Sequence, residues 1–385
     1  MEDRMRFVMK VREGGSPFAE ICRQHGISRD KGYKWWRRYR EGGVEQMAER
    51  SRRPLRSPGQ TSELWRHRLV EERKRYGWGP KKLWVKLCQR YPDEKVPSVC
   101  TLGRVLWQEG LVEARRCSKR RVAMRLEHTV AQRANEVWAA DFKGWFRTGD
   151  GCRCDPLTVS DLYSRYVLCC QLVKGQNFEA VKPIFQELFA RYGMPGKIRC
   201  DNGSPFGTQG LGGWSQLSLW WLTLGIGTEF IQPSHPEQNG IHERMHRNLK
   251  PVTRPAAATV IDQQKRLDQW RRQYNTDRPH EALKQQVPAD FYSPSQRKFQ
   301  RPKPPNYPFS YIRSKVDDRG RIRWNQTPFF IGKALSHQTV GIKPVHPDRL
   351  EIYLRDQLLG HILPDSGCRG LVPCNQSPLN PALNS

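Results

Sequence analysis

The chain has 385 residues, of which 66 are Lys or Arg and 38 are Asp or Glu, so its formal net charge is +28. This length suffices for about two to four domains, and a hydrophobic content of 37% with 13 tryptophans excludes general disorder. Such a positive excess indicates a polyanionic partner, with nucleic acid first and an anionic membrane second. The longest apolar run, Leu217–Gly227, is about half a membrane span, which argues against a membrane protein.

The cysteines and the N-terminal stretch indicate a cytoplasmic protein. The segment MEDRMRFVMKV is charged throughout and lacks the apolar region of a secretory signal. The 11 cysteines are irregularly spaced, which fits reduced thiols better than a disulfide framework. The pairs Cys152/Cys154 and Cys368/Cys374 have no second ligand pair at zinc-finger spacing, so no structural zinc is expected.

A first helix-turn-helix domain is predicted over residues 1–48. Helical patterns cover Met5–Arg12, Pro17–Gln24 and Arg29–Arg40. Gly26 supplies the turn and Ser28 is a suitable N-cap for the third helix. In such a domain the start of the last helix enters the major groove of DNA, where this chain offers Ser28, Arg29, Lys31 and Lys34. The alternative is a small three-helix bundle with a solvated basic face, and Tyr33 and Trp36 are expected in its core rather than stacked on bases.

A second helix-turn-helix domain is predicted over residues 60–112, after a basic linker at roughly Glu49–Thr61. Its expected helices are Glu63–Arg75, Lys81–Arg90 and Val99–Gln108. Ser98 is suited to cap the third helix, and Thr101 and Arg104 are expected to point outward toward DNA.

A basic linker is predicted over residues 113–134. Its segment EARRCSKRRVAMR holds six basic residues and one acid, and residues 1–134 as a whole hold 33 basic and 16 acidic side chains. The segment is either a solvated linker or a strap along DNA phosphates. The side chains that we expect to contact phosphates are Arg115, Arg116, Arg120 and Arg121.

The next region, residues 135–297, alternates between strand and helix patterns. The expected strands are Glu136–Arg147, Leu157–Leu162, Tyr166–Val173, Lys197–Cys200 and Thr228–Ile231. The expected helices are Phe178–Tyr192, Leu217–Leu224 and a long helix from about Gln238. This order predicts a mixed α/β sheet flanked by helices.

The C-terminal part differs in composition. The chain becomes rich in proline after Leu283, which predicts a linker. Residues 309–363 alternate as short strands with turns at Asp317–Gly320 and His346–Asp348, and this pattern predicts a small β-barrel. Residues 364–385 are expected to form a disordered tail.

Three acids occur in settings that favour metal chemistry. Asp141 lies in the apolar strand VWAADF, Asp201 directly follows the strand KIRC, and Glu243 lies in the first turns of the helix after PEQNG. A carboxylate in a strand core is costly unless a cation or a donor meets it. If the two strands are neighbours and the helix packs beside their ends, the three carboxylates converge. Such oxygen ligands suit Mg²⁺ or Mn²⁺, and two such ions catalyse in-line phosphoryl transfer.

The segments around these acids resemble the catalytic core of the retroviral-integrase superfamily, in the form found in bacterial insertion-sequence transposases. Five motifs follow one another in the family's order: VWAAD (137–141), DLYSRY (161–166), DNGSPF (201–206), PEQNGIHER (236–244) and YNTDRPH (274–280). A weaker resemblance extends to the helix-turn-helix region. The His-His-Cys-Cys zinc module of retroviral integrases is absent, and 41 residues separate Asp201 from Glu243, more than in many relatives.

This resemblance implies an RNase H-like catalytic domain whose DDE triad falls on Asp141, Asp201 and Glu243. These acids would be both the catalytic residues and the ligands of two Mg²⁺ or Mn²⁺ ions, whereas Asp161 would be structural. The activity implied is DNA cleavage at the element ends and strand transfer. The partners implied are double-stranded DNA, as terminal inverted repeats and target, and further copies of the chain assembled on it in the bacterial nucleoid.

The helix that carries Glu243 is expected to contact DNA. His246, Arg247 and Lys250 follow Glu243 by three, four and seven residues, which places them on the same face of a helix. We expect these side chains, with Asn239 before the helix, to contact phosphates beside the metal ions; the alternative is a solvated basic face.

Three other functions compete with transposition. A transposase-derived DNA-binding regulator would have lost an acid, but all three are present. An RNase H or a Holliday-junction nuclease would not need two N-terminal DNA-reading domains. A scaffold without catalysis would leave the carboxylate in the apolar strand unexplained.

Overall fold

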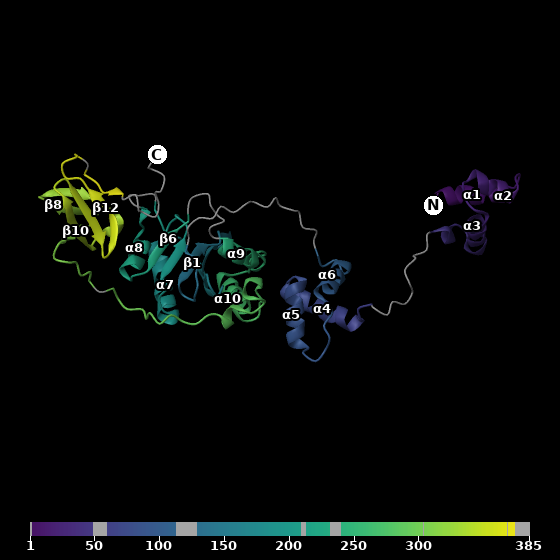
Figure 1. Cartoon of the computed structure of the whole chain (residues 1–385), viewed down its shortest axis with the longest axis horizontal. Coiled ribbons are helices and arrows are strands. Elements are labelled where there is room, and N and C mark those ends of the chain that lie inside the picture. Colours follow the sequence, from purple (N-terminus) through teal and green to yellow (C-terminus); the bar gives the residue numbers. More distant parts are fainter. Residues whose placement is uncertain are drawn as a thin grey trace. The chain divides into compact units, whose positions relative to one another are not determined.

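A computed structural model of the chain describes residues 2–48, 60–112, 129–208, 213–231, 240–302, 304–367 and 369–373 (Figure 1). The chain divides into two compact units, Met1–Leu64 and Trp65–Ser385. Within the described ranges, none of the helices combines the length and the apolar character needed to span a membrane.

The first unit is helical, as the sequence predicts. Its elements are α1 (Glu2–Glu13), α2 (Phe18–Gln24), α3 (Arg29–Gly42) and the 3₁₀-helix η1 (Val44–Met47). Five side chains form its buried core: Phe7, Val8, Ile21, Cys22 and Met47. The Ser28 hydroxyl accepts a hydrogen bond from the Lys31 amide and so caps α3. Tyr33 is 53% exposed, because its ring stacks on Phe18 at the surface, so the expectation that it lies in the core is wrong.

Three further helices form the N-terminal part of the second unit. They are α4 (Glu63–Tyr76), α5 (Pro80–Arg90) and α6 (Val99–Gln108). The apolar faces of these helices share one cluster of buried side chains: Leu69, Trp78, Leu83, Leu87, Leu102, Val105 and Leu106. Pro80 occupies the first turn of α5, where its missing N–H costs nothing, and Ser98 caps α6. The sequence therefore predicts all three helices to within a residue or two.

A mixed six-stranded sheet follows. Its strands are β1 (Val137–Phe142), β2 (Phe146–Arg147), β3 (Arg153–Asp161), β4 (Val167–Val173), β5 (Lys197–Cys200) and β6 (Gly227–Phe230). Strand β3 pairs antiparallel with β1, β2 and β4, whereas β1 pairs in parallel with β5, and β5 in parallel with β6. The expected single strand Glu136–Arg147 is divided in two, because Gly144 takes a positive φ of 89° between β1 and β2.

Helices cover both faces of this sheet (Figure 1). They are α7 (Phe178–Tyr192), α8 (Gln216–Thr223), α9 (Gly240–Thr253) and α10 (Val260–Thr276). Leu168 of β4 packs in the cluster that contains α7 and α8, whereas its neighbour Val167 packs with α9 and α10, because successive strand residues point to opposite faces. The long helix expected from about Gln238 is two helices, with Pro255 in the segment between them.

The segment after Leu283 is not a free linker over its whole length. The 3₁₀-helices η4 (Glu281–Leu283) and η5 (Pro288–Asp290) begin it. The Ser295 amide then donates to the Tyr192 carbonyl, and the Met194 amide to the Arg297 carbonyl. These bonds hold the chain up to Arg297 against the end of α7.

The C-terminal region is an antiparallel sheet rather than a demonstrated barrel. A five-stranded sheet has the order β13-β12-β11-β10-β7, and β8 pairs separately with β9. The strands are β7 (Ile312–Lys315), β8 (Arg321–Trp324), β9 (Thr327–Phe330), β10 (Thr339–His346), β11 (Arg349–Leu354), β12 (Gln357–Ile362) and β13 (Val372–Pro373). Between β9 and β10 lies the 3₁₀-helix η6 (Lys333–Leu335). Because β13 pairs with β12, the expected disordered tail from residue 364 is in part an edge strand.

Candidate metal centre

Asp141 lies on the face of the sheet that α9 covers. In β1, Trp138 and Ala140 pack in the cluster of α7 and α8, whereas Val137 and Ala139 belong to a separate cluster. The alternation of a strand puts Asp141 on the same face as Val137 and Ala139. Its side chain is 24% exposed, so the carboxylate is neither in the apolar core nor freely solvated.

Asp201 lies beside Asp141 at the end of the neighbouring parallel strand. The paired residues are Val137 with Lys197 and Ala139 with Arg199, and the continuation of this register places Asp141 level with Asp201. Asp201 is exposed, and its Oδ1 accepts a hydrogen bond of 3.3 Å from the Gly203 amide as the chain turns away. The expected convergence of these two acids therefore follows from the pairing of β1 with β5.

Glu243 occupies the first turn of α9, where its side chain is exposed. Its charge acts on Asp141. Burial, with smaller contributions from the negative charges of Asp201 and Glu243, raises the pKa of Asp141 to about 7. The negative charges of Asp201 and Glu243 thus act on Asp141 against the smaller, opposite effect of the Lys143 ammonium group, and an excess of negative charge of this kind favours a bound cation.

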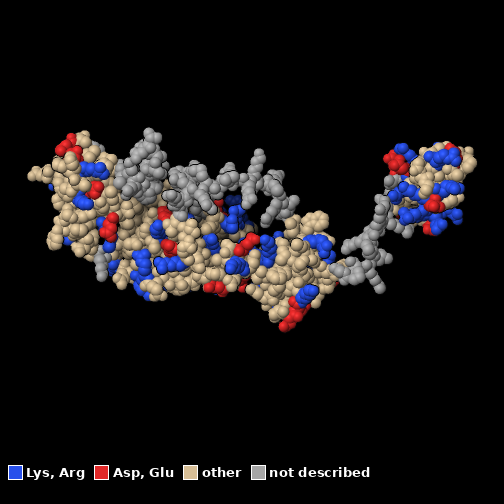
Figure 2. All heavy atoms as spheres, viewed as in Figure 1, with Lys and Arg blue, Asp and Glu red and all other residues tan. Residues whose placement is uncertain are grey.

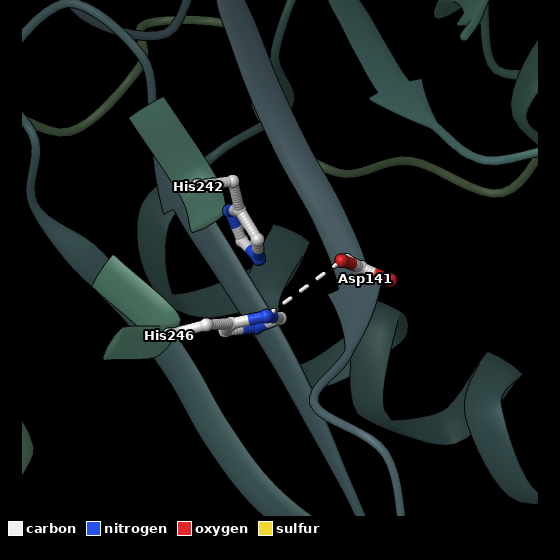
Figure 3. A group of neighbouring side chains, drawn as sticks. All are labelled: Asp141, His242 and His246. Atoms are coloured by element: carbon white, nitrogen blue, oxygen red, sulfur yellow. Dashed lines mark ion pairs between the residues drawn. The ribbon is translucent and has the colours of Figure 1, made fainter. Parts of the chain in front are cut away.

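Two histidines of α9 complete the surroundings of Asp141 (Figure 3). His242 and His246 lie one turn apart and are both buried. One nitrogen of each ring and one carboxylate oxygen of Asp141 all lie within 4.8 Å of one another. His246 Nδ1 is 3.7 Å from Asp141 Oδ2. Burial lowers the pKa of His246 to about 3 and that of His242 well below its ordinary value, so both rings are neutral.

Hydroxyl groups of β3 connect these rings to the backbone of β1. Thr158 Oγ1 donates to the Asp141 carbonyl oxygen at 2.9 Å and lies 2.8 Å from His242 Nε2 and 2.7 Å from His246 Nε2. Ser160 Oγ lies 2.9 Å from His242 Nδ1. The alternation of β3 explains this polar face, because Leu157 and Val159 point to the opposite cluster.

The structure separates His246 from Arg247 and Lys250. The latter two are exposed on α9, whereas His246 is only 9% exposed and turns toward the sheet. A buried neutral ring does not present a charge to DNA phosphates, so the expectation of one stripe of three basic side chains is wrong for His246. Asn239 lies outside the described residues.

The other predicted DNA contacts are distributed over the helices. Ser28, Arg29, Lys31 and Lys34 are exposed at the start of α3, and Figure 2 shows many Lys and Arg side chains on the visible face of this helical unit. In α6, Arg104 is exposed, whereas Thr101 is partly buried and its hydroxyl lies 3.0 Å from Ser98 Oγ. Arg115, Arg116, Arg120 and Arg121 lie outside the described residues.

Sequence patterns give a weak signal for the other polar residues around Asp141. His242 and His246 are separated by four positions, which places both on one face of a helix, and Thr158 and Ser160 alternate with apolar residues. Neither pattern is informative alone. Only the packing of α9 across β1 and β3 makes them one site.

Comparison with protein families finds matches along most of the chain. Residues 3–54 match a helix-turn-helix domain and residues 31–106 a homeodomain-like domain. Residues 131–236 and 224–288 match integrase core domains. Asp141, Asp201 and Glu243 all lie within the integrase core matches.

Two curated relatives come from bacterial insertion elements. The chain is 25% identical over 240 residues to the insertion element IS407 31.7 kDa protein of Burkholderia multivorans, covering 61% of this chain and 82% of that protein. It is 26% identical over 182 residues to the insertion element IS476 39.2 kDa protein of Xanthomonas euvesicatoria, covering 47% of this chain and 51% of that protein.

Solved structures with a similar course of the chain include retroviral integrases. The HTLV-2 integrase catalytic core domain in complex with magnesium is 14% identical, with a TM-score of 0.33, and the match covers 42% of this chain and 99% of that one. A chain in the structure of the simian T-cell lymphotropic virus intasome in complex with the PP2A regulatory subunit B56 gamma is 14% identical, with a TM-score of 0.38, over 80% of this chain and 100% of that one.

Proposed function

We propose that this chain, which is an insertion-element protein with helix-turn-helix domains and an integrase core domain, is the transposase that cuts DNA at the ends of its element and joins those ends to a target. The observation that carries this proposal is the parallel register of β1 and β5, which places Asp141 level with Asp201; burial and the charges of Asp201 and Glu243 raise the pKa of Asp141 in this setting. A DNA-binding regulator would not need three mutually repelling acids.

The residues fit a divalent cation. Carboxylate oxygens are the ligands that Mg²⁺ and Mn²⁺ prefer, and the three acids are Asp141, Asp201 and Glu243. The cations, two in our proposal, would lower the pKa of a water or of a DNA 3′-hydroxyl and stabilise the charge of the attacked phosphate. The protein contributes the position of the carboxylates: paired strands fix the two aspartates, and α9 carries the glutamate to their side.

DNA recognition is assigned to the exposed start of α3 and, more weakly, to α6. Ser28, Arg29, Lys31 and Lys34 are accessible to a major groove, and the exposed Arg247 and Lys250 of α9 are placed to contact phosphates near the acids. Because each phosphate contact releases counterions, binding should weaken steeply with salt. The replacement of both Lys31 and Lys34 by Ala should reduce the affinity for terminal DNA, whereas the same double change at Lys10 and Arg12 of α1 is the matched control.

The decisive experiment is a strand-transfer assay with the full chain, Mg²⁺ and DNA that carries both element ends. Asp141→Asn, Asp201→Asn and Glu243→Gln keep the side-chain shape but remove the charge that holds the cations. Each should reduce cleavage and joining by at least about 100-fold, while a gel shift with the same proteins stays within about twofold of wild type.

Two results would contradict the proposal. If one variant joins DNA at nearly the wild-type rate, the assignment of that acid is wrong. If the wild type binds terminal DNA but neither cuts nor joins it with Mg²⁺ or Mn²⁺, the chain is a regulator rather than a transposase.

A further inference from the structure

The proton positions in the network below Asp141 follow from its distances. A threonine hydroxyl has a single proton, and Thr158 directs it to the Asp141 carbonyl oxygen at 2.9 Å. The same oxygen lies 2.8 Å from His242 Nε2 and 2.7 Å from His246 Nε2. Since Thr158 has only lone pairs left for these two contacts, both histidines carry their proton on Nε2 and donate it to Thr158.

The two histidines then differ at their other ring nitrogen. His242 Nδ1 accepts the hydroxyl proton of Ser160 at 2.9 Å, so both of its nitrogens are satisfied. His246 Nδ1 makes no hydrogen bond of this kind among the described residues; Asp141 Oδ2 lies 3.7 Å away, and Lys143 acts on the ring as a nearby positive charge. An imidazole lone pair and a carboxylate oxygen thus point toward the same space, from opposite elements, in a partly buried site (Figure 3). Two acceptors in this arrangement repel each other unless a cation or a shared proton lies between them.

We infer that His246 Nδ1 is a nitrogen ligand of the divalent cation held by Asp141, so that the metal centre is formed by oxygen and nitrogen rather than by carboxylates alone. This inference rests on the proposed metal-dependent function and adds a ligand to it. Bonds of about 2.1 Å to one ion place two ligand atoms about 3.0–3.4 Å apart, for octahedral and tetrahedral angles respectively. The observed distance of 3.7 Å between His246 Nδ1 and Asp141 Oδ2 is slightly longer, and a small rotation of the Asp141 side chain shortens it to this range.

The surrounding hydrogen bonds have the form expected around a metal-binding histidine. A ligating imidazole generally donates its second N–H to a fixed acceptor, which sets the tautomer and the ring orientation. His246 makes this donation to Thr158, and Thr158 is itself fixed by its bond to the backbone of β1. His242 fills the other acceptor position of Thr158 and is a positioning residue in this scheme.

A nitrogen ligand changes which cation the site prefers. Mg²⁺ favours oxygen ligands, whereas imidazole suits transition metals, with Mn²⁺ tolerating both. The centre should therefore bind Mn²⁺ more tightly than Mg²⁺ by a wider margin than a site formed only by carboxylates. His246→Gln should narrow this margin about tenfold, mainly by weakening Mn²⁺ binding.

The test uses Mn²⁺ as the probe on the full chain, without DNA and without an activity readout. Pulsed electron paramagnetic resonance of bound Mn²⁺ detects the ¹⁴N nucleus of a directly bonded imidazole. The wild type should show this nitrogen coupling. His246→Gln should lose the coupling while still binding Mn²⁺ through its acids, and His242→Gln, one turn away, should retain it. Thermal melts identify any variant that fails to fold, and His246→Asn provides a second replacement of the ring.

The outcomes separate this inference from the proposed function. Mn²⁺ that binds in an Asp141-dependent way but shows no nitrogen coupling overturns the His246 ligand and leaves the metal-dependent function intact. The inference is also overturned if the nitrogen coupling disappears in His242→Gln and persists in His246→Gln, because His242 would then be the ligand. Mn²⁺ binding that is equal in the wild type and in Asp141→Asn contradicts the proposed metal centre itself.

Discussion

Asp141 and Asp161 lie on two hydrogen-bonded strands of one sheet, β1 and β3, but their surroundings are opposite. Asp161 is fully buried, and its carboxylate accepts hydrogen bonds from the Asn135 amide at 2.8 Å and from the Ser164 amide and hydroxyl at 2.8 and 2.6 Å. Asp141 has fewer donors: the Phe142 amide and the Lys143 charge act on it, but so do two further acids, and His246 Nδ1 lies 3.7 Å away. The carboxylate of Asp161 is therefore satisfied by its donors, whereas that of Asp141 is free to bind a cation in our proposal.

The sequence predicts different roles for the two acids. Asp161 links two segments of the chain, because its partner Ser164 lies in the turn after β3 and its partner Asn135 lies just before β1. Asn135 in turn accepts from the Trp138 indole and from the Tyr292 hydroxyl. The function of Asp161 in our proposal is therefore structural, and its replacement should affect folding rather than metal binding.

The largest expected difference between the two acids is in cation binding. Asp141→Asn should weaken Mn²⁺ binding by more than about 100-fold, because it removes the ligand that both strands and the α9 histidines converge on. Asp161→Asn should bind Mn²⁺ as the wild type does, once the folded fraction is taken into account. Calorimetric titration of the full chain measures both. Equal losses in the two variants would show that the contrast between these acids is not functional.

The free energy of unfolding should change in opposite directions when the two acids are replaced. Asp161→Ala leaves the Asn135 and Ser164 donors unsatisfied in a buried site and should destabilise the fold by about 2–4 kcal/mol. Asp141→Asn should stabilise the metal-free protein by about 1–3 kcal/mol at pH 8, because it removes a buried charge that two acids repel. Denaturant unfolding in the presence of EDTA tests both changes, and a destabilising Asp141→Asn would contradict the electrostatic account of the site.

Both the stability of the metal-free chain and its affinity for Mn²⁺ should depend on pH through Asp141. The pKa of Asp141 is raised to about 7 in the folded metal-free chain, so the folded state holds a proton that the unfolded state has released. The contribution of Asp141 to stability is therefore complete below about pH 4 and is lost as the pH rises through 7. Protons also compete with the cation, so Mn²⁺ affinity should fall below pH 7, by up to about tenfold per pH unit. A profile that is flat from pH 5.5 to 7.5 would argue against Asp141 as the titrating ligand.

The smallest effect is expected at Ser160. Ser160→Ala leaves His242 Nδ1 without its donor and should cost about 1–2 kcal/mol of stability. Mn²⁺ affinity should change less than threefold, about 0.6 kcal/mol, because His242 is not a ligand. A large loss of Mn²⁺ binding in Ser160→Ala would place His242, rather than His246, next to the cation.

The sequence by itself determines most of the elements, and it predicts which acids form the site. Local signals suffice where capping residues and apolar periodicity act within one element: Ser28 and Ser98 start α3 and α6, and Lys197–Cys200 is the strand β5 that ends before Asp201. The motifs around Asp141, Asp201 and Glu243 identify the integrase core because their order along the chain is itself the signal.

Tertiary structure alone decides which residues share a site. The register of β1 with β5 places Asp201 level with Asp141, and no local pattern encodes the pairing of strands that lie 60 residues apart. The same is true of His246. Its position three residues after Glu243 suggests an exposed basic stripe, but the apolar residues Met245 and Leu249 turn α9 so that His242 and His246 face the sheet. Burial then keeps the His246 ring neutral, so that a residue expected to contact DNA becomes a candidate metal ligand. The sequence does not show this, because the free energy of desolvation depends on what surrounds a side chain in space and not on its neighbours in sequence.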